Sequence, residues 1–203
     1  MKVVIVDYDT GNTHSLRQAL ENVGLKVIIS KDPSIIQEAS GIILPGVGAF
    51  PKAMAALKKQ NLISPIKQAV ALGTPLLGIC LGMQLLFKES VEHEVTEGLN
   101  LIPGKVIPIP RFEELPIPHM GWNQLIEEKD SFLRESVDQD YVYYVHSYYA
   151  DCPEEVVVAS SDYGVKIPGI VNVKNVYGMQ FHPEKSGEVG KKLLKEFKKV
   201  VER

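Results

Sequence analysis

Cysteine is scarce in this sequence, and positive charge is not in excess. Two cysteines among 203 residues cannot build a disulfide framework, which favours a reducing compartment. A net charge of -3 gives no broad attraction for phosphate, which argues against nucleic acid or an anionic membrane as a partner. Asp7 stands too early to leave room for the apolar segment of a signal peptide. We therefore expect a cytoplasmic protein.

Motifs for cofactors and metals are also missing. The pattern G-x-G-x-x-G, which marks dinucleotide-binding folds, does not follow the first apolar segment. The five histidines and two cysteines show neither H-E-x-x-H nor C-x-x-C spacing. We expect no cofactor and no metal site.

One uncharged stretch imitates a membrane span. Residues 68–87 are twenty in number, and twenty helical residues reach ~30 Å, the thickness of a bilayer core. Gly73-Thr74-Pro75 would break such a helix near its start, and glutamines and glycines dilute its hydrophobicity. The stretch instead predicts a helix end, a turn, a buried strand and a second helix.

Short apolar segments alternate with helical ones in the first half of the chain. Residues 3–7, 26–30 and 41–45 are typical of strands buried on both faces, and residues 11–24 have the spacing of a helix. This βαβα order predicts an α/β fold with a parallel core sheet.

The second half of the chain has a different pattern of turns and apolar segments. After about residue 100, proline-rich turns separate shorter strand candidates at 141–150, 156–160 and 175–181, which indicate antiparallel strands added to the core. Residues 186–203 predict an amphipathic helix. Because no linker divides residues 1–203, we expect a single domain.

Cys80 stands between a predicted strand and a predicted helix, in the stretch GICLGMQLLF. With Gly78 and Gly82 it forms G-x-C-x-G, the pattern of a nucleophile elbow, where glycines let strand and helix approach while the central side chain projects from a strained turn. The helix N-terminus would favour thiolate over thiol. A small buried apolar cysteine is the alternative interpretation.

The stretch VYGMQFHPEKS supplies what a thiolate nucleophile needs, a base and a group to orient it. His182 follows a predicted strand, and Glu184 lies two residues on, toward the same side of an extended segment. Pro183 restricts the backbone between them. Glu184 can then bind one imidazole nitrogen while the other faces Cys80. A surface turn with a chance histidine and glutamate is the alternative.

A glycine-rich turn follows the strand predicted at 41–45. The backbone N–H groups of PGVGAF (45–50) would lie at the carboxyl edge of the sheet, where they can point at a developing oxyanion. Pro-Gly-x-Gly alone is a common turn. Three strand-end features that each supply a different part of acyl-transfer chemistry are much less expected by chance.

These motifs, in this order and spacing, resemble the class I glutamine amidotransferases over essentially the whole chain. The resemblance implies their αβα three-layer fold and a Cys-His-Glu triad that hydrolyses glutamine. Within that family, PHMGWN (118–123), Met83, Lys185 and the start DYDTGN look like the glutaminase subunits of imidazole glycerol phosphate synthase in histidine biosynthesis. Asp9 departs from the small residue usual in that opening loop.

The resemblance implies a role for each matching residue. Cys80 would attack the amide carbon, His182 would protonate the departing ammonia and then activate water, and Glu184 would hold the imidazole. Val47 and Leu81 would supply the oxyanion N–H groups. The residues implied for binding L-glutamine are Gly48, Gln84, Glu92, Ser147 and Tyr148.

The resemblance also implies a partner. It is a separate (β/α)8-barrel subunit that forms a heterodimer with this chain and uses the ammonia to make imidazole glycerol phosphate and an aminoimidazole ribonucleotide. The implied docking residues are His119, Met120, Trp122, Asn123, Tyr143 and Lys185. Without the resemblance, a lone tryptophan would be read as core.

We further expect the isolated chain to be a poor glutaminase that its liganded partner activates through the PGVG loop. Asn12 could help to hold one arrangement of that loop, or could simply cap a helix.

Two other functions fit parts of the sequence. VVIVDYDTG nearly matches the D-x-D-x-T loop of haloacid-dehalogenase-type phosphatases, although the threonine follows the second aspartate directly. A flavodoxin-like binding module with a relic site would carry an inert Cys80. Cys152, in a loop, has no evident task.

Overall fold

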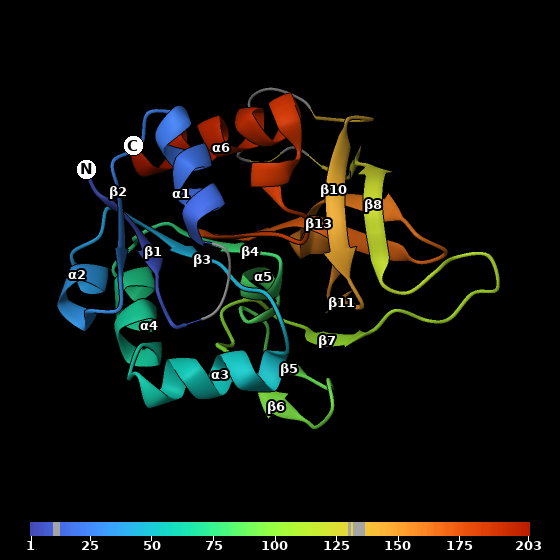
Figure 1. Ribbon diagram of the computed structural model, residues 1–203, viewed down its shortest axis with the longest axis horizontal. Helices are drawn as coiled ribbons and strands as arrows, with labels where there is room; N and C mark the ends of the chain where they lie inside the picture. Colours follow the sequence, from blue (N-terminus) through green and yellow to red (C-terminus); the bar gives the residue numbers. More distant parts are fainter. Residues whose placement is uncertain (10–12, 130, 132–136) are drawn as a thin grey trace.

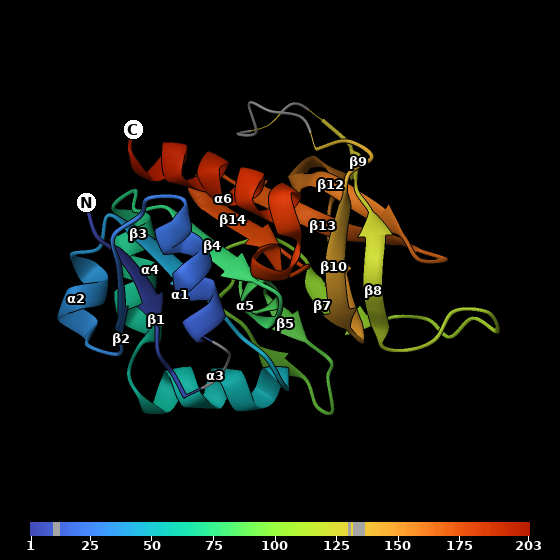
Figure 2. The same ribbon diagram turned by 45° about the horizontal axis from the view of Figure 1, so that its top comes forward.

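An eight-stranded sheet forms the centre of the computed structural model, which describes residues 1–9, 13–129, 131 and 137–203. Five neighbouring strands are parallel, and three antiparallel strands extend the sheet at one edge (Figure 1 and Figure 2). Their order across the sheet is β2 (Val27–Ser30), β1 (Val3–Val6), β3 (Gly41–Leu44), β4 (Leu76–Ile79), β14 (Val176–Met179), β13 (Lys166–Val173), β12 (Val157–Asp162) and β9 (Ile126–Glu127). The predicted parallel core with antiparallel additions is confirmed.

Helices cover both faces of this sheet, because the parallel strands are apolar on both sides. One face packs against α1 (Thr13–Asn22) and α6 (Gly187–Val201). The other face packs against α2 (Pro33–Gln37), α3 (Phe50–Lys59) and α4 (Ile63–Ala71). Figure 2 shows α6 and α3 on opposite sides, so the three-layer αβα arrangement predicted from the resemblance is confirmed.

The uncharged stretch 68–87 folds within these layers. It contains the end of α4, strand β4 and the short helix α5 (Leu81–Gln84), as the glycine and proline positions predicted. Helix α5 is only four residues long, shorter than the apolar pattern indicated. No helix in the described part of the chain is long and apolar enough to span a membrane.

Two smaller sheets accompany the central one, which they meet where β8 contacts β12 and β11 contacts β13. One pairs β8 (His119–Gln124) with β10 (Tyr141–His146), and the other has the order β11 (Tyr148–Asp151), β7 (Lys105–Pro108), β5 (Glu89–Ser90), β6 (Thr96–Glu97). The prediction of a single strand at 141–150 is therefore wrong, because this stretch forms two strands, β10 and β11, that belong to different sheets. The chain passes from one sheet to the other at Ser147, whose carbonyl accepts a hydrogen bond from Ile109 N at 3.0 Å.

Candidate active site

Cys80 lies in a strained turn between β4 and α5. Its backbone has φ 54° and ψ -114°, a conformation that L-residues rarely adopt outside functional turns. A Cβ at Gly82 would come within 1.8 Å of Leu44 O, and one at Gly78 within 2.5 Å of Gly82 O. Both positions therefore need glycine for strand and helix to approach this closely. The nucleophile elbow predicted from G-x-C-x-G is present.

The N-terminus of α5 directly follows the cysteine. Leu81 is its first residue, so its N–H has no acceptor within the helix, and Leu81 lines the same cavity as Cys80. Val47, in the loop after β3, lines the same cavity. These are the two residues implied as oxyanion donors.

His182 and Glu184 form a buried pair after β14. Glu184 Oε1 lies 2.8 Å from His182 Nδ1, and their side chains are 6% and 5% exposed. His182 N donates to Tyr143 O at 2.9 Å, which fixes the backbone of the histidine. The other ring nitrogen, Nε2, is buried and has no hydrogen-bond partner among the described residues. Glu184 thus orients the ring, as the i and i+2 spacing predicted.

Opposing effects set the pKa of His182. Burial by itself lowers it, but the Cys80 sulfur and the Glu184 carboxylate raise it to about 9, above the ordinary 6.5. The imidazolium form of His182 is therefore favoured at neutral pH.

A cavity of about 470 Å³ brings the predicted residues together. It is lined by Cys80, by His182, by both residues implied as oxyanion donors and by all five residues implied for glutamine binding, and Glu184 is paired with His182. The full lining is Val47, Gly48, Cys80, Leu81, Gln84, Glu92, Pro118, Val145, His146, Ser147, Tyr148 and His182.

Two of the implied glutamine-binding residues also hold the structure together. Glu92 Oε2 accepts a hydrogen bond from Phe50 N at 2.8 Å and so caps α3, which has no side-chain cap from its own N-cap residue. Gln84 Nε2 donates to Tyr148 O at 2.9 Å and to Gln180 Oε1 at 3.1 Å. The polar wall of the cavity is therefore fixed before any ligand binds.

Sequence reasoning missed His146 and Gln180. Gln180 is buried behind the cysteine, and His146 lines the cavity while bonding Tyr148 O through Nδ1 at 2.8 Å. Val142, Tyr144 and His146 occupy every second position of one strand. This spacing could have placed His146 on the same, inner face as the two apolar residues.

The residues implied for docking fall into two groups, an exposed one and one on the inner face, because successive side chains of a strand point to opposite sides. Met120 and Trp122 on β8 are exposed at 64% and 57%, and Trp122 makes an edge contact with the Tyr143 ring at 6.0 Å. Lys185 Nζ lies 5.8 Å from the centroid of the Tyr143 ring. His119 is 2% exposed and belongs to the inner face, while Asn123, also on that side, bonds to it.

Two further residues were singled out from the sequence, Cys152 and Asn12. Cys152 is not at the site, and burial together with Asp151 and Glu155 raises its pKa to about 12, which keeps it a thiol. Asn12 lies outside the described residues, so its part in gating stays a prediction.

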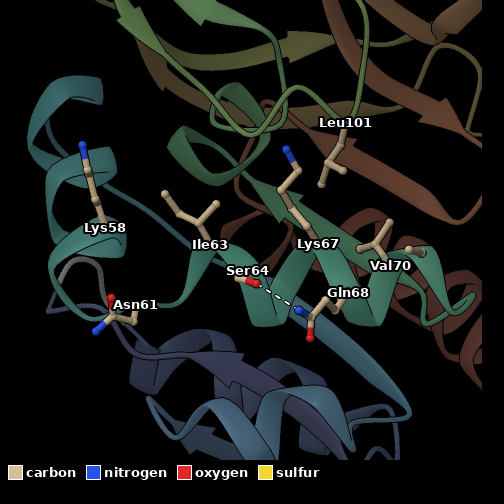
Figure 3. A pocket seen from close by; sticks show the side chains of 9 residues that line it. Lys58, Asn61, Ile63, Ser64, Lys67, Gln68, Val70 and Leu101 are labelled. Carbon is tan, nitrogen blue, oxygen red and sulfur yellow. Dashed lines mark hydrogen bonds between the residues drawn. The ribbon is translucent and has the colours of Figure 1, made fainter.

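A larger cavity, of about 740 Å³, lies beside α4 (Figure 3). Its described lining contains no histidine, cysteine or carboxylate, and its Ser64 accepts a hydrogen bond from Gln68 at 3.0 Å. Size alone therefore does not mark the reactive site. The lining residues are Lys58, Asn61, Ile63, Ser64, Lys67, Gln68, Val70, Ala71 and Leu101.

Known proteins resemble this chain in fold and in sequence. A crystal structure described as glutamine amidotransferase matches with a TM-score of 0.78 at 18% identity, covering 98% of this chain and 99% of that one. A structure of PurLQS from Thermotoga maritima matches with a TM-score of 0.76 at 21% identity, covering 98% and 97%. At these identities the likeness concerns the fold.

Sequence relatives are much closer. The imidazole glycerol phosphate synthase subunit HisH of Listeria monocytogenes serotype 4a (strain HCC23) is 53% identical over 199 residues, covering 98% of this chain and 96% of that one. The HisH subunit of Bacillus mycoides (strain KBAB4) is 53% identical over 203 residues, with 98% and 95% covered. Residues 4–200 match the family described as glutamine amidotransferase class-I. The chain therefore belongs to the class I glutamine amidotransferases and, within them, to the HisH glutaminase subunits of imidazole glycerol phosphate synthase.

Proposed function

We propose that Cys80, His182 and Glu184 are the triad with which this chain hydrolyses glutamine to glutamate and ammonia. One observation carries the assignment. A histidine whose Nδ1 is held by a buried carboxylate at 2.8 Å leaves its Nε2 unpartnered, at a cavity that also contains a cysteine in a strained turn. Nucleophile, base and orienting group are the parts that acyl transfer needs.

The reaction divides into two halves. The Cys80 thiolate attacks the amide carbon, and the carbonyl oxygen becomes an oxyanion that the N–H groups of Val47 and Leu81 stabilise. The C–N bond breaks as the His182 imidazolium gives its proton to the nitrogen, which leaves as ammonia. Neutral His182 then takes a proton from water, and the resulting hydroxide attacks the thioester. Glutamate leaves, and the thiolate and imidazolium are restored.

The cavity wall suits an amino acid substrate. Glu92 offers a carboxylate to the substrate ammonium, and the polar groups of Gln84, Ser147 and Tyr148 surround the space beside it. Gly48 has φ +98°, and no atom lies within 4 Å of the place where a Cβ would stand, so its backbone is open to the ligand.

Ammonia in water becomes ammonium, which is not a nucleophile, so it needs a covered path to its acceptor. We propose that a (β/α)8-barrel subunit docks over Met120, Trp122, Tyr143 and Lys185 as a heterodimer and makes imidazole glycerol phosphate with the ammonia. The exposed aromatic and the neighbouring cation support this surface, because such residues anchor interfaces. A cytoplasmic location and a single domain over residues 1–203 remain parts of the same proposal.

The test separates making ammonia from using it. In the complex with the barrel subunit, Cys80→Ala should abolish glutamine-dependent synthesis and leave synthesis from ammonium salt at alkaline pH intact. His182→Ala should behave alike, and Glu184→Gln should keep some activity, because an orienting group is less essential than nucleophile or base. Cys152→Ala is the matched control and should change neither reaction. Loss of both reactions in Cys80→Ala would show that Cys80 is structural.

A further inference from the structure

Two buried histidines stand side by side at the edge of the glutamine cavity. His119 on β8 and His146 on β10 are directly opposite in the register of the two strands. His119 Nδ1 lies 2.9 Å from His146 Nε2, and the two residues are 2% and 7% exposed. The triad mechanism uses neither ring.

Backbone groups at the two ends decide which atom donates in each bond. His146 Nδ1 contacts Tyr148 O at 2.8 Å, and since a carbonyl only accepts, this nitrogen carries the proton. In the neutral ring His146 Nε2 is then an acceptor, so His119 Nδ1 must donate to it. His119 Nε2 is in turn left to accept from Asn123 Nδ2 at 3.2 Å.

Asn123 is fixed by its own backbone contacts. Its Nδ2 also donates to Asp162 O at 2.9 Å, and its Oδ1 accepts from Gln124 N at 2.8 Å. The amide cannot be turned over without losing both bonds. A single direction of donation therefore runs from Asn123 through His119 and His146 to Tyr148 O.

The rings are held rigidly enough to keep that direction. His119 is stacked between Tyr144, at 4.5 Å between centroids, and Tyr163, at 3.9 Å. Tyr163 Oη donates to Pro116 O at 2.7 Å, so the stacking partner is itself anchored. Burial lowers the pKa of His146 to about 3 and that of His119 to about 4, which keeps both rings neutral.

The chain of bonds ends at the substrate wall. Tyr148 O also accepts from Gln84 Nε2 at 2.9 Å, and Gln84, Ser147 and Tyr148 all line the cavity. At its other end, Asn123 directly follows Trp122 on β8, the strand whose outer face carries the proposed docking residues. The histidines thus join the inner side of that strand to the glutamine site.

We propose that Asn123, His119 and His146 form a positioning relay, which holds the Ser147–Tyr148 segment in the geometry that binds glutamine. This inference rests on the proposed function of the cavity. It assigns His119 and Asn123 to substrate positioning instead of direct contact with the partner. Removing the relay should weaken glutamine binding and leave the chemistry at Cys80 largely in place.

Kinetics in the complex with the barrel subunit test the relay. His119→Leu removes the donor and the acceptor, and should raise KM for glutamine at least 10-fold while kcat changes less than 3-fold. His119→Asn keeps a donor near the place of Nδ1 and should recover part of the loss. Tyr141→Phe, on the same pair of strands but 54% exposed, is the matched control and should leave KM unchanged. Synthesis from ammonium salt checks that each variant folds and assembles.

A second measurement needs no variant. Long-range ¹⁵N–¹H correlation spectra of the full chain should show both His119 and His146 as neutral rings protonated at Nδ1. A proton at Nε2 of either ring would overturn the relay, and so would an unchanged KM in His119→Leu or a fall in kcat alone. If the wild-type complex hydrolyses no glutamine, the proposed function itself fails. If the wild-type complex hydrolyses glutamine, but the spectra or the kinetics of His119→Leu contradict these expectations, the relay alone is wrong.

Discussion

At the scale of single residues, His182 shows how burial and neighbouring charges compete. Its side chain is almost fully buried, which disfavours the imidazolium, yet Cys80 and Glu184 together outweigh that effect. Because the pKa of His182 is raised to about 9, the histidine already carries at neutral pH the proton that the proposed mechanism gives to the departing nitrogen.

The raised pKa of His182 has consequences that pH can test. Because the folded-state pKa of about 9 exceeds the ordinary 6.5, the stabilisation it gives is complete below pH 6.5 and is lost as the pH rises through about 9. kcat/KM for glutamine should fall over the upper part of that range, since the proton donor for ammonia is lost. Stopped assays across the range, with ammonium-dependent synthesis as reference, measure this.

Cys80→Ala removes one of the groups that raise the pKa of His182. The midpoint of the His182 ring signals in an NMR titration should therefore shift downward toward 6.5. Cys152→Ala, which changes the other cysteine, should leave the midpoint where it is. An identical midpoint in Cys80→Ala and wild type would contradict the effect assigned to the Cys80 sulfur on the pKa of His182.

At the scale of elements, the turn from β4 to α5 depends on backbone approach. Gly82 packs against the end of β3, with Leu44 O where a Cβ would lie. The same contact sets the distance between the PGVG loop and the Cys80 turn. A side chain here would push apart Val47 and Leu81, the proposed oxyanion residues, as well as the layers.

Gly82→Ala should accordingly destabilise the chain by about 3 kcal/mol or more and reduce glutaminase activity, since the obstacle is backbone that cannot move aside. Gly73→Ala is the control. Gly73 has φ +97° but no atom near its Cβ position, so the change should cost only about 1–2 kcal/mol for the left-handed conformation. Urea unfolding of both variants measures the difference, and equal losses would show that the close approach at Gly82 is not what matters.

At the scale of the whole molecule, the pair of strands β8 and β10 has two faces that differ in exposure, and a different function is proposed for each. The inner face carries the histidines and Tyr144, and the outer face presents Met120 and Trp122. Val145 lines the cavity, and Cys80 Sγ lies 3.8 Å from its carbonyl oxygen. The proposed docking surface is thus next to Cys80, where the proposed mechanism releases ammonia.

Trp122, the only tryptophan, reports on that surface. When the barrel subunit binds, its emission should shift to shorter wavelength and its quenching by iodide should fall at least 2-fold, because a side chain now 57% exposed becomes covered. Trp122→Phe supplies the background signal. Unchanged emission and quenching in a complex verified by its mass would place the interface elsewhere.

Much of the site could be predicted from the sequence, because its parts are local. The spacing of Gly78, Cys80 and Gly82 encodes an elbow without reference to distant residues, and the spacing of His182 and Glu184 encodes an oriented base. Apolar runs of strand length likewise predicted the parallel core. In each case the physical constraint acts between residues a few positions apart.

Only the tertiary structure decided which side of β8 faces inward. Alternation along HMGWN separates His119 and Asn123 from Met120 and Trp122, but it leaves open which set is covered. That depends on pairing with β10 and on packing against Tyr163 and Asp162, which are some forty residues away in sequence. The role of His146 was hidden for the same reason, since a hydrogen-bond partner brought by another strand has no signature in the local pattern.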